Sequence, residues 1–269
     1  MKHISRIYTA LIMLFLYAPI AVMIVFSFNS ARSTSVFGGF SLKWYAELLN
    51  DSSTIEALKN TLILAVASSV IATVLGTLSA VGIFYMKRKW TRSAAMTVTN
   101  IPMMNPDIVT GISLMLLFVF VGHMVGSNNS LGFGTMLIAH ITFNLPYVIL
   151  SVLPKLKQTD THLSEAAQDL GCTPFQSFFK VVLPSIMPGV FTGMIMAFTL
   201  SLDDFVISYF TTGPDFQTLP IKIFSMTKRR VTPDMYALST LIFLSVLVLL
   251  ILINLAQSKA DKKREGAAV

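Results

Sequence analysis

Acidic side chains inside apolar segments are the residues of this chain with the clearest chemical potential. Asp107, Asp203 and Asp204 lie in long stretches that contain no Lys or Arg. A carboxylate within a membrane is costly unless it meets water or a partner, so it usually marks a substrate or ion pathway. Phe205 and Tyr209 follow, and aromatic faces attract cations. This combination of side chains is suited to conducting a cation.

The same aspartates also have a purely structural interpretation. They can hydrogen-bond to neighbouring helices or cap a broken helix. His140 and Asn144 lie one helical turn apart in another apolar segment, face the same way and are candidate partners for them. The sequence leaves these two interpretations open.

Other kinds of chemistry lack the residues they need. Cys172 is the single cysteine, and no CxxC or HExxH spacing offers a zinc site. No G-x-x-x-x-G-K-[ST] loop is present, so we expect no ATP hydrolysis and no cofactor on this chain. An intramembrane enzyme would need a nucleophile beside a base, and His140 has no serine or metal partner at helical spacing. The chain is therefore expected to be non-catalytic.

The elements that position these residues are membrane-spanning helices. Of the 269 residues, 54% are hydrophobic and 12% are charged, and the mean hydropathy is +0.71. A soluble domain carries about 25% charged residues, and a membrane-spanning helix needs about 20 apolar residues. The composition predicts an all-α integral membrane protein with six transmembrane helices, at residues 9–28, 61–86, 102–125, 131–153, 187–210 and 236–256.

The distribution of basic residues predicts the orientation. Most of the 20 Lys and Arg residues fall in the segments that are cytoplasmic if both termini face the cytoplasm. One outer loop opposes this assignment, because it contains Lys222, Lys228, Arg229 and Arg230. The net charge of +7 comes from short clusters beside apolar segments and does not indicate nucleic-acid binding.

This topology gives the aspartates different depths. Asp203 lies sixteen residues into the fifth span, about 24 Å at 1.5 Å per residue, so we expect it near the outer face. Asp107 follows Pro102 and Pro106, which disrupt helical hydrogen bonding and would open the inner end of the third span.

Small residues that recur every four positions predict close helix packing. In the second span they form a smooth stripe on one helix face, and Gly189 and Gly193 repeat the spacing in the fifth span. The residues of the stripe are Ser68, Ala72, Gly76 and Ala80.

The loop between the fourth and fifth spans, residues 154–186, is too polar to be a simple connector. Asp160 or Thr161 can cap a short helix, and Gly171 suits the left-handed residue after its end. Thr173 and Pro174 would start a second short helix, which Pro184 would end. The first helix would expose an apolar, partly charged face suited to a partner's groove, formed by Glu165, Ala166, Ala167 and Leu170.

This loop resembles the EAA motif of permeases in bacterial ABC importers. The matching residues keep the spacing of the motif, with Val181 where isoleucine is favoured: Glu165, Ala166, Ala167, Gly171, Leu183 and Pro184. The resemblance implies a type I ABC importer permease (MetI-like) fold, with residues 1–269 as a single transmembrane permease domain. It also implies that the cytoplasmic loop 154–186 docks on an ATPase subunit through Glu165, Ala166, Ala167, Leu170 and Gly171.

Further motifs resemble the C-type permeases of spermidine/putrescine importers. They lie at residues 40–45, 101–113, 200–208 and 212–214. The resemblance implies polyamine substrates and a complex in the bacterial cytoplasmic (inner) membrane. Its partners would be a dimer of ABC ATPase subunits that binds ATP and Mg²⁺, a second homologous permease and an extracytoplasmic binding protein.

Polyamines match the residues described above. They are chains of ammonium groups separated by methylenes, so carboxylates and aromatic rings are suitable contacts. Asp107, Asp203, Asp204, Phe205 and Tyr209 are therefore the candidate pathway residues. An ABC importer for another small organic or cationic substrate is an alternative. A secondary transporter is disfavoured because it would need no EAA spacing and the halves show no inverted repeat.

Overall fold

The computed structural model describes residues 2–32, 36–126, 131–160, 162–228 and 233–265. Within these ranges the chain is helical, apart from loops and one isolated bridge between Asn29 and Phe40. The chain forms two compact units, one made of Glu56–Ile221 and the other of Met1–Ile55 with Lys222–Val269.

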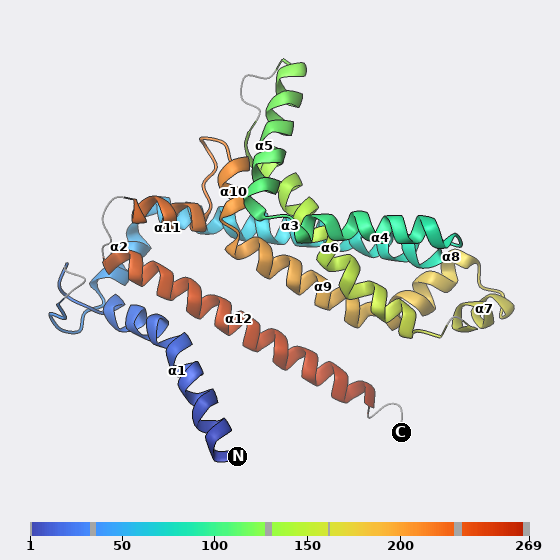
Figure 1. Cartoon of the computed structure of the whole chain (residues 1–269), viewed down its shortest axis with the longest axis horizontal. Helices are drawn as coiled ribbons and strands as arrows, with labels where there is room; N and C mark the ends of the chain where they lie inside the picture. Colours follow the sequence, from blue (N-terminus) through green and yellow to red (C-terminus); the bar gives the residue numbers. More distant parts are fainter. Residues whose placement is uncertain (1, 33–35, 127–130, 161, 229–232, 266–269) are drawn as a thin grey trace. The chain divides into compact units, whose positions relative to one another are not determined.

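Figure 1 shows the helices in chain order. Their bounds are α1 (Lys2–Ser27), α2 (Lys43–Asn50), α3 (Ser52–Tyr85), α4 (Lys89–Met104), α5 (Asp107–Met124), α6 (Phe133–Gln158), α7 (His162–Asp169), α8 (Pro174–Ser177), the π-helical η1 (Phe178–Val182), α9 (Leu183–Asp203), α10 (Val206–Thr211), α11 (Leu219–Thr227) and α12 (Pro233–Glu265).

Five helices of the described residues are long and apolar enough to cross a membrane: Arg6–Ser27, Ser52–Tyr85, Asp107–Met124, Phe133–Gln158 and Pro174–Asp203. The expected sixth span lies within α12, whose Pro233–Val248 part is apolar. The predicted all-helical membrane fold is therefore confirmed. The second span begins nine residues earlier than expected and the fourth ends five residues later, and the third and fifth spans differ in more informative ways.

The third span begins at Asp107 and not at residue 102. Pro102 lies inside α4, a separate helix that occupies most of the segment expected to connect the second and third spans. Asn105 is extended, with φ −84° and ψ 136°. A proline disfavours helical geometry in the residue before it, so Pro106 separates α4 from α5.

The fifth span starts earlier and ends earlier than expected. Helices α8, η1 and α9 form one continuous helix, Pro174–Asp203, which we call the α8–α9 helix. The prediction that Pro184 ends a short helix is wrong. Pro184 lies in the first turn of α9 directly after the π-helical stretch η1. A π-helical turn accommodates an interruption of the α-helical hydrogen-bond ladder without ending the helix.

The core of the Glu56–Ile221 unit contains α6, which packs against both α3 and α9. A Cβ on Gly76 of α3 would lie 2.6 Å from the Val148 side chain of α6. A Cβ on Gly193 of α9 would lie 3.1 Å from the Val148 Cα atom. Since both glycines face the same valine, the small residues have the packing role that their spacing predicted.

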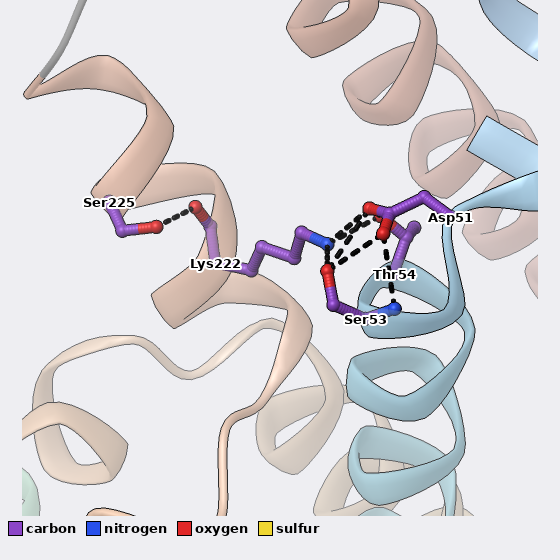
Figure 2. Close-up of polar contacts among 5 residues, drawn as sticks. All are labelled: Asp51, Ser53, Thr54, Lys222 and Ser225. Atoms are coloured by element: carbon purple, nitrogen blue, oxygen red, sulfur yellow. Dashed lines mark hydrogen bonds and ion pairs between the residues drawn. The ribbon is translucent and has the colours of Figure 1, made fainter. Parts of the chain in front are cut away.

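The other unit holds polar contacts around the start of α3. The Trp44 Nε1 atom donates to the Asn29 carbonyl at 2.6 Å, which ties α2 to the end of α1. Lys222 of α11 donates to the Asp51 carboxylate at 2.6 Å and to the hydroxyls of Ser53 and Thr54, as Figure 2 shows. The hydrogen bonds that Asp51 accepts from Lys222, Thr54 and Ser53 hold the pKa of its carboxyl well below the usual range.

Two of the basic residues that opposed the predicted orientation have contacts within this unit. Lys222 contributes to the basic outer loop that opposed the predicted topology, but its charge is paired with Asp51. Lys228 lies over the Phe224 ring, 4.8 Å from its centroid. Arg229 and Arg230 lie outside the described residues.

Candidate functional site

The fifth span breaks at its two aspartates. Helix α9 ends at Asp203, and Asp204 is extended with φ −62° and ψ 123°. The Asp204 carboxylate accepts hydrogen bonds from the backbone N–H groups of Ile207 at 3.3 Å and Ser208 at 2.8 Å. These bonds satisfy the first donors of α10 and favour a negative charge at its start. The capping role left open by the sequence is confirmed for Asp204.

A buried polar network fixes this break. His140 of α6 is 1% exposed, and its two ring nitrogens lie 2.7 Å from the Ser201 hydroxyl and 2.9 Å from the Ser208 hydroxyl. The Asp204 carboxylate lies 3.5 Å from His140 Nε2. Ser68 of α3 donates to Ser201 at 2.9 Å. The network therefore joins α3, α6, α9 and α10.

His140 has two serine partners, although neither lies at helical spacing from it. Ser201 and Ser208 lie on other helices, so helical spacing could not reveal them. Both serines are almost fully buried, at 2% and 1% exposure. Because no substrate can reach these hydroxyls in this conformation, the group serves to hold helices together.

Asn144 behaves differently from its neighbour His140. It is fully buried, and its amide has no hydrogen-bond partner among the described residues. The prediction that His140 contacts an aspartate is confirmed. The structure shows no such contact for Asn144.

The other candidate pathway residues lie on the exposed side of the break. Asp203 is exposed, and Tyr209 is 43% exposed. The Phe205 and Tyr209 rings pack with centroids 5.4 Å apart. Adjacent aspartates thus point to different environments, Asp204 into the network and Asp203 away from it.

Asp107 begins α5, which packs beside α10. A Cβ on Gly111, one turn after Asp107, would lie 3.0 Å from the Phe210 ring and 3.5 Å from the Ile207 Cα atom. The first turns of α5 therefore lie beside α10, near the break after Asp203.

The second candidate site is the loop at the other end of the α8–α9 helix. Helix α7 begins after Asp160, whose carboxylate accepts from the His162 N–H at 3.0 Å, while Thr161 lies outside the described residues. Gly171 has φ +90°, as its predicted left-handed position requires. The Cys172 N–H donates to the Ala167 carbonyl and the Gly171 N–H to the Gln168 carbonyl, which closes α7 with a Schellman motif.

The start of α8 also follows the prediction. The Thr173 hydroxyl accepts from the Gln176 N–H at 3.3 Å, and the Gln176 side chain accepts from the Thr173 N–H at 3.2 Å. The hydroxyls of Ser164 and Ser177 lie 3.0 Å apart and tie α7 to α8. The Ser177 hydroxyl also donates to the Ser164 carbonyl at 3.1 Å, so this serine pair joins the two short segments.

The exposed face of α7 is smaller than expected. Leu170 is 88% exposed and the Glu165 side chain 72% exposed, and Ala166 is exposed as well. Ala167 is buried, contrary to the prediction. A two-turn helix has only one free face, and Ala167 lies three residues after Ser164 on the face that packs against α8 and η1. We call Glu165, Ala166 and Leu170 the α7 face.

Long apolar helices, one of which breaks at the Asp203–Asp204 pair, together with one polar loop that exposes a helical face, are typical of a membrane transport component. Residues 72–265 match the family of binding-protein-dependent transport system inner membrane components, and the chain belongs to this family.

Relatives support this assignment over nearly the whole chain. The chain is 41% identical to the spermidine/putrescine transport system permease protein PotC of Escherichia coli (strain K12), over 94% of this chain and 93% of the relative. It is 38% identical to the putrescine transport system permease protein PotI of the same strain, over 93% and 89%.

Solved structures support the fold. A chain from the crystal structure of a bacterial ABC transporter involved in the import of the acidic polysaccharide alginate superimposes with a TM-score of 0.71 and 17% identity. The match covers 96% of this chain and 98% of that chain. The predicted MetI-like permease fold is thereby confirmed.

Proposed function

We propose that this chain is a permease subunit of an ATP-driven polyamine importer in the bacterial inner membrane. The observation that carries the proposal is the continuous α8–α9 helix. It connects the loop that contains α7 at one end with the helix break at Asp203 and Asp204 at the other. The names of the relatives, which are permease proteins for spermidine and putrescine, support the substrate class.

In this proposal the loop 154–186 faces the cytoplasm, as do both termini. The α7 face and the turn at Gly171 contact one subunit of an ATPase dimer, which binds ATP and Mg²⁺. Ala167 contributes by packing α7 against η1, so a push on α7 is transmitted into the α8–α9 helix. The single permease domain, residues 1–269, pairs with a second homologous permease.

An extracytoplasmic binding protein delivers the polyamine in this proposal. The exposed side chain of Phe40 suits such a contact, whereas Trp44 of the same motif is buried and holds α2 in place. Asp203, Phe205, Tyr209 and Asp107 then line the path, because the carboxylates and aromatic faces attract ammonium groups. Asp204 shapes the path by capping α10.

Uptake by the reconstituted complex tests the function. The chain is co-expressed with its cognate ATPase, second permease and binding protein, and the complex is purified and placed in proteoliposomes. We expect uptake of radiolabelled putrescine or spermidine that requires ATP and the binding protein. Uptake without ATP, or no polyamine uptake by a complex that hydrolyses ATP, would contradict the proposal.

A further inference from the structure

Helix α6 lies between two helices that both carry a small residue at every fourth position. The repeat on α9 consists of Gly189, Gly193, Ala197 and Ser201, and that on α3 of Ser68, Ala72, Gly76 and Ala80. Contacts define the register of α9 on α6. Ser201 meets His140, and Gly193 meets Val148, eight residues later on α6. Halfway between them, Ala197 lies at the level of Asn144.

Among the described residues at the contact between α6 and α9, Asn144 is a buried polar residue whose side chain lacks a hydrogen-bond partner. It is 0% exposed, and neither its Oδ1 nor its Nδ2 atom is hydrogen-bonded within the described part of the chain. One turn away, both ring nitrogens of His140 have serine partners. A buried amide without a partner is costly, whereas a hydroxyl brought beside it would satisfy it.

We propose that Asn144 is a second partner for Ser201, and that α9 moves along α6 by one helical turn, about 5.4 Å, during transport. In the observed register Ser201 bonds His140. In the shifted register Ser201 bonds Asn144 instead. Ser201 thus exchanges one hydrogen-bond partner for another. Displacements of one helical turn between packed elements are a known form of conformational switch.

The fourfold repeat makes this displacement sterically feasible. Each small residue of α9 takes the place of the one four residues before it, so no large side chain of the stripe has to cross α6. Ala197 would replace Gly193 beside Val148, where a Cβ lies 3.1 Å from the Val148 Cα atom and the helices must separate by a few tenths of an ångström. The break after Asp203 and the π-helical η1 interrupt regular helix at the two ends of α9.

The inference rests on the proposed transport function, in which the α8–α9 helix carries movement from the ATPase to the pathway. It adds the direction of that movement, along the axis of α6, and the residue that receives Ser201. Disulfide cross-linking in the assembled transporter can distinguish the two registers.

The cross-linking variants start from Cys172→Ser and share Ser151→Cys on α6. Gly193→Cys reports the observed register, because a Cβ on Gly193 lies 3.4 Å from the Ser151 Cβ atom, close to the ~3.8 Å of disulfides. Ala197→Cys reports the shifted register, because Ala197 is one turn further from Ser151. Ser201→Cys, two turns away, gives the background.

Yields are compared between the nucleotide-free complex and the complex trapped with ATP and vanadate. We expect the ratio of the Ala197 to the Gly193 cross-link to change by about tenfold or more between the two states. If the Gly193→Cys pair does not assemble, the Ala197 pair decides alone, since its yield is compared between states of one protein. An Ala197 yield at background in both states overturns the inference.

Asn144→Ala tests the residue itself. We expect it to lower the Ala197 cross-link about fivefold, the effect of one neutral hydrogen bond, and to leave the Gly193 cross-link intact. An unchanged Ala197 yield would show that Asn144 does not receive Ser201. The two levels of failure are separable, because ATP-dependent uptake by the Cys172→Ser parent tests the transport function and the cross-links test the movement.

Discussion

The two ends of the α8–α9 helix are held in opposite ways. At the Asp203 end, side chains from four helices meet in a buried network around His140. At the Pro174 end, α7 is held by backbone caps and a serine pair, and Leu170 and Glu165 are exposed. The polar groups at the Asp203 end are thus satisfied within the chain, whereas the Pro174 end leaves Leu170 and Glu165 exposed, as the proposed contact with an ATPase requires.

The largest effect is expected where the network is broken. Asp204→Ala removes the cap of α10 and a partner of His140, so we expect it to lower the free energy of unfolding by about 2–4 kcal/mol. Asp203→Ala is the matched control, because the neighbouring carboxylate is exposed, and its change should stay within about 0.5 kcal/mol. Unfolding in detergent measures both, and equal losses would remove the distinction between the two aspartates.

Asp203, which should matter little for stability, should matter for transport. Asp203→Asn keeps the size of the side chain and removes the charge, so we expect uptake to fall while the complex with the ATPase still assembles. Asn at position 203 cannot attract an ammonium group as a carboxylate does. Initial uptake rates over a range of polyamine concentrations provide the measurement, and unchanged kinetics would exclude Asp203 from the path.

At the loop end, a change of backbone should have an intermediate effect. Gly171→Ala places a side chain at φ +90°, and a left-handed residue costs about 1–2 kcal/mol. Gly126→Ala imposes similar strain at φ +74° after α5 and serves as the control. Only Gly171→Ala should reduce the recovery of the ATPase in a pull-down, since it distorts the end of α7. Equal recovery from both variants would mean that the geometry of this turn is unimportant for docking.

On the α7 face, we expect a substitution to weaken binding of the ATPase while hardly changing stability. Leu170→Ala truncates a side chain that is 88% exposed, so the free energy of unfolding should change by less than about 0.5 kcal/mol. Binding of the ATPase should weaken about tenfold if Leu170 fills a groove on the partner. Ala167→Leu is the contrasting variant, because overpacking the buried face should reduce stability and binding together.

The comparison also shows what the sequence could predict. Local signals were sufficient for the loop: Thr173, Pro174 and Gly171 specify their caps through rules that involve only neighbouring residues. The small-residue stripes likewise predicted close packing. In contrast, the partners of His140 come from α9 and α10, and contacts between helices far apart in sequence leave no spacing to detect.

The misplaced spans have a related cause. Hydropathy is averaged over about 20 residues, so it does not detect a break of one or two residues within an apolar stretch. Pro106 and Asp204 each end a helix inside such a stretch. Both residues were noted in the sequence, but whether they interrupt a helix depends on the tertiary contacts that satisfy the freed backbone groups.

The smallest effect concerns the ion pair outside both regions. Hydrogen bonds from Lys222, Thr54 and Ser53 hold the pKa of Asp51 below its usual range, so its stabilising contribution is complete above about pH 5 and is lost only as the pH falls through the lowered folded value. The difference in unfolding free energy between the natural chain and Asp51→Asn should be constant from pH 6 to 8 and shrink in stronger acid. A difference that varies between pH 6 and 8 would contradict this assignment, because the Asp51 carboxylate does not change its charge there.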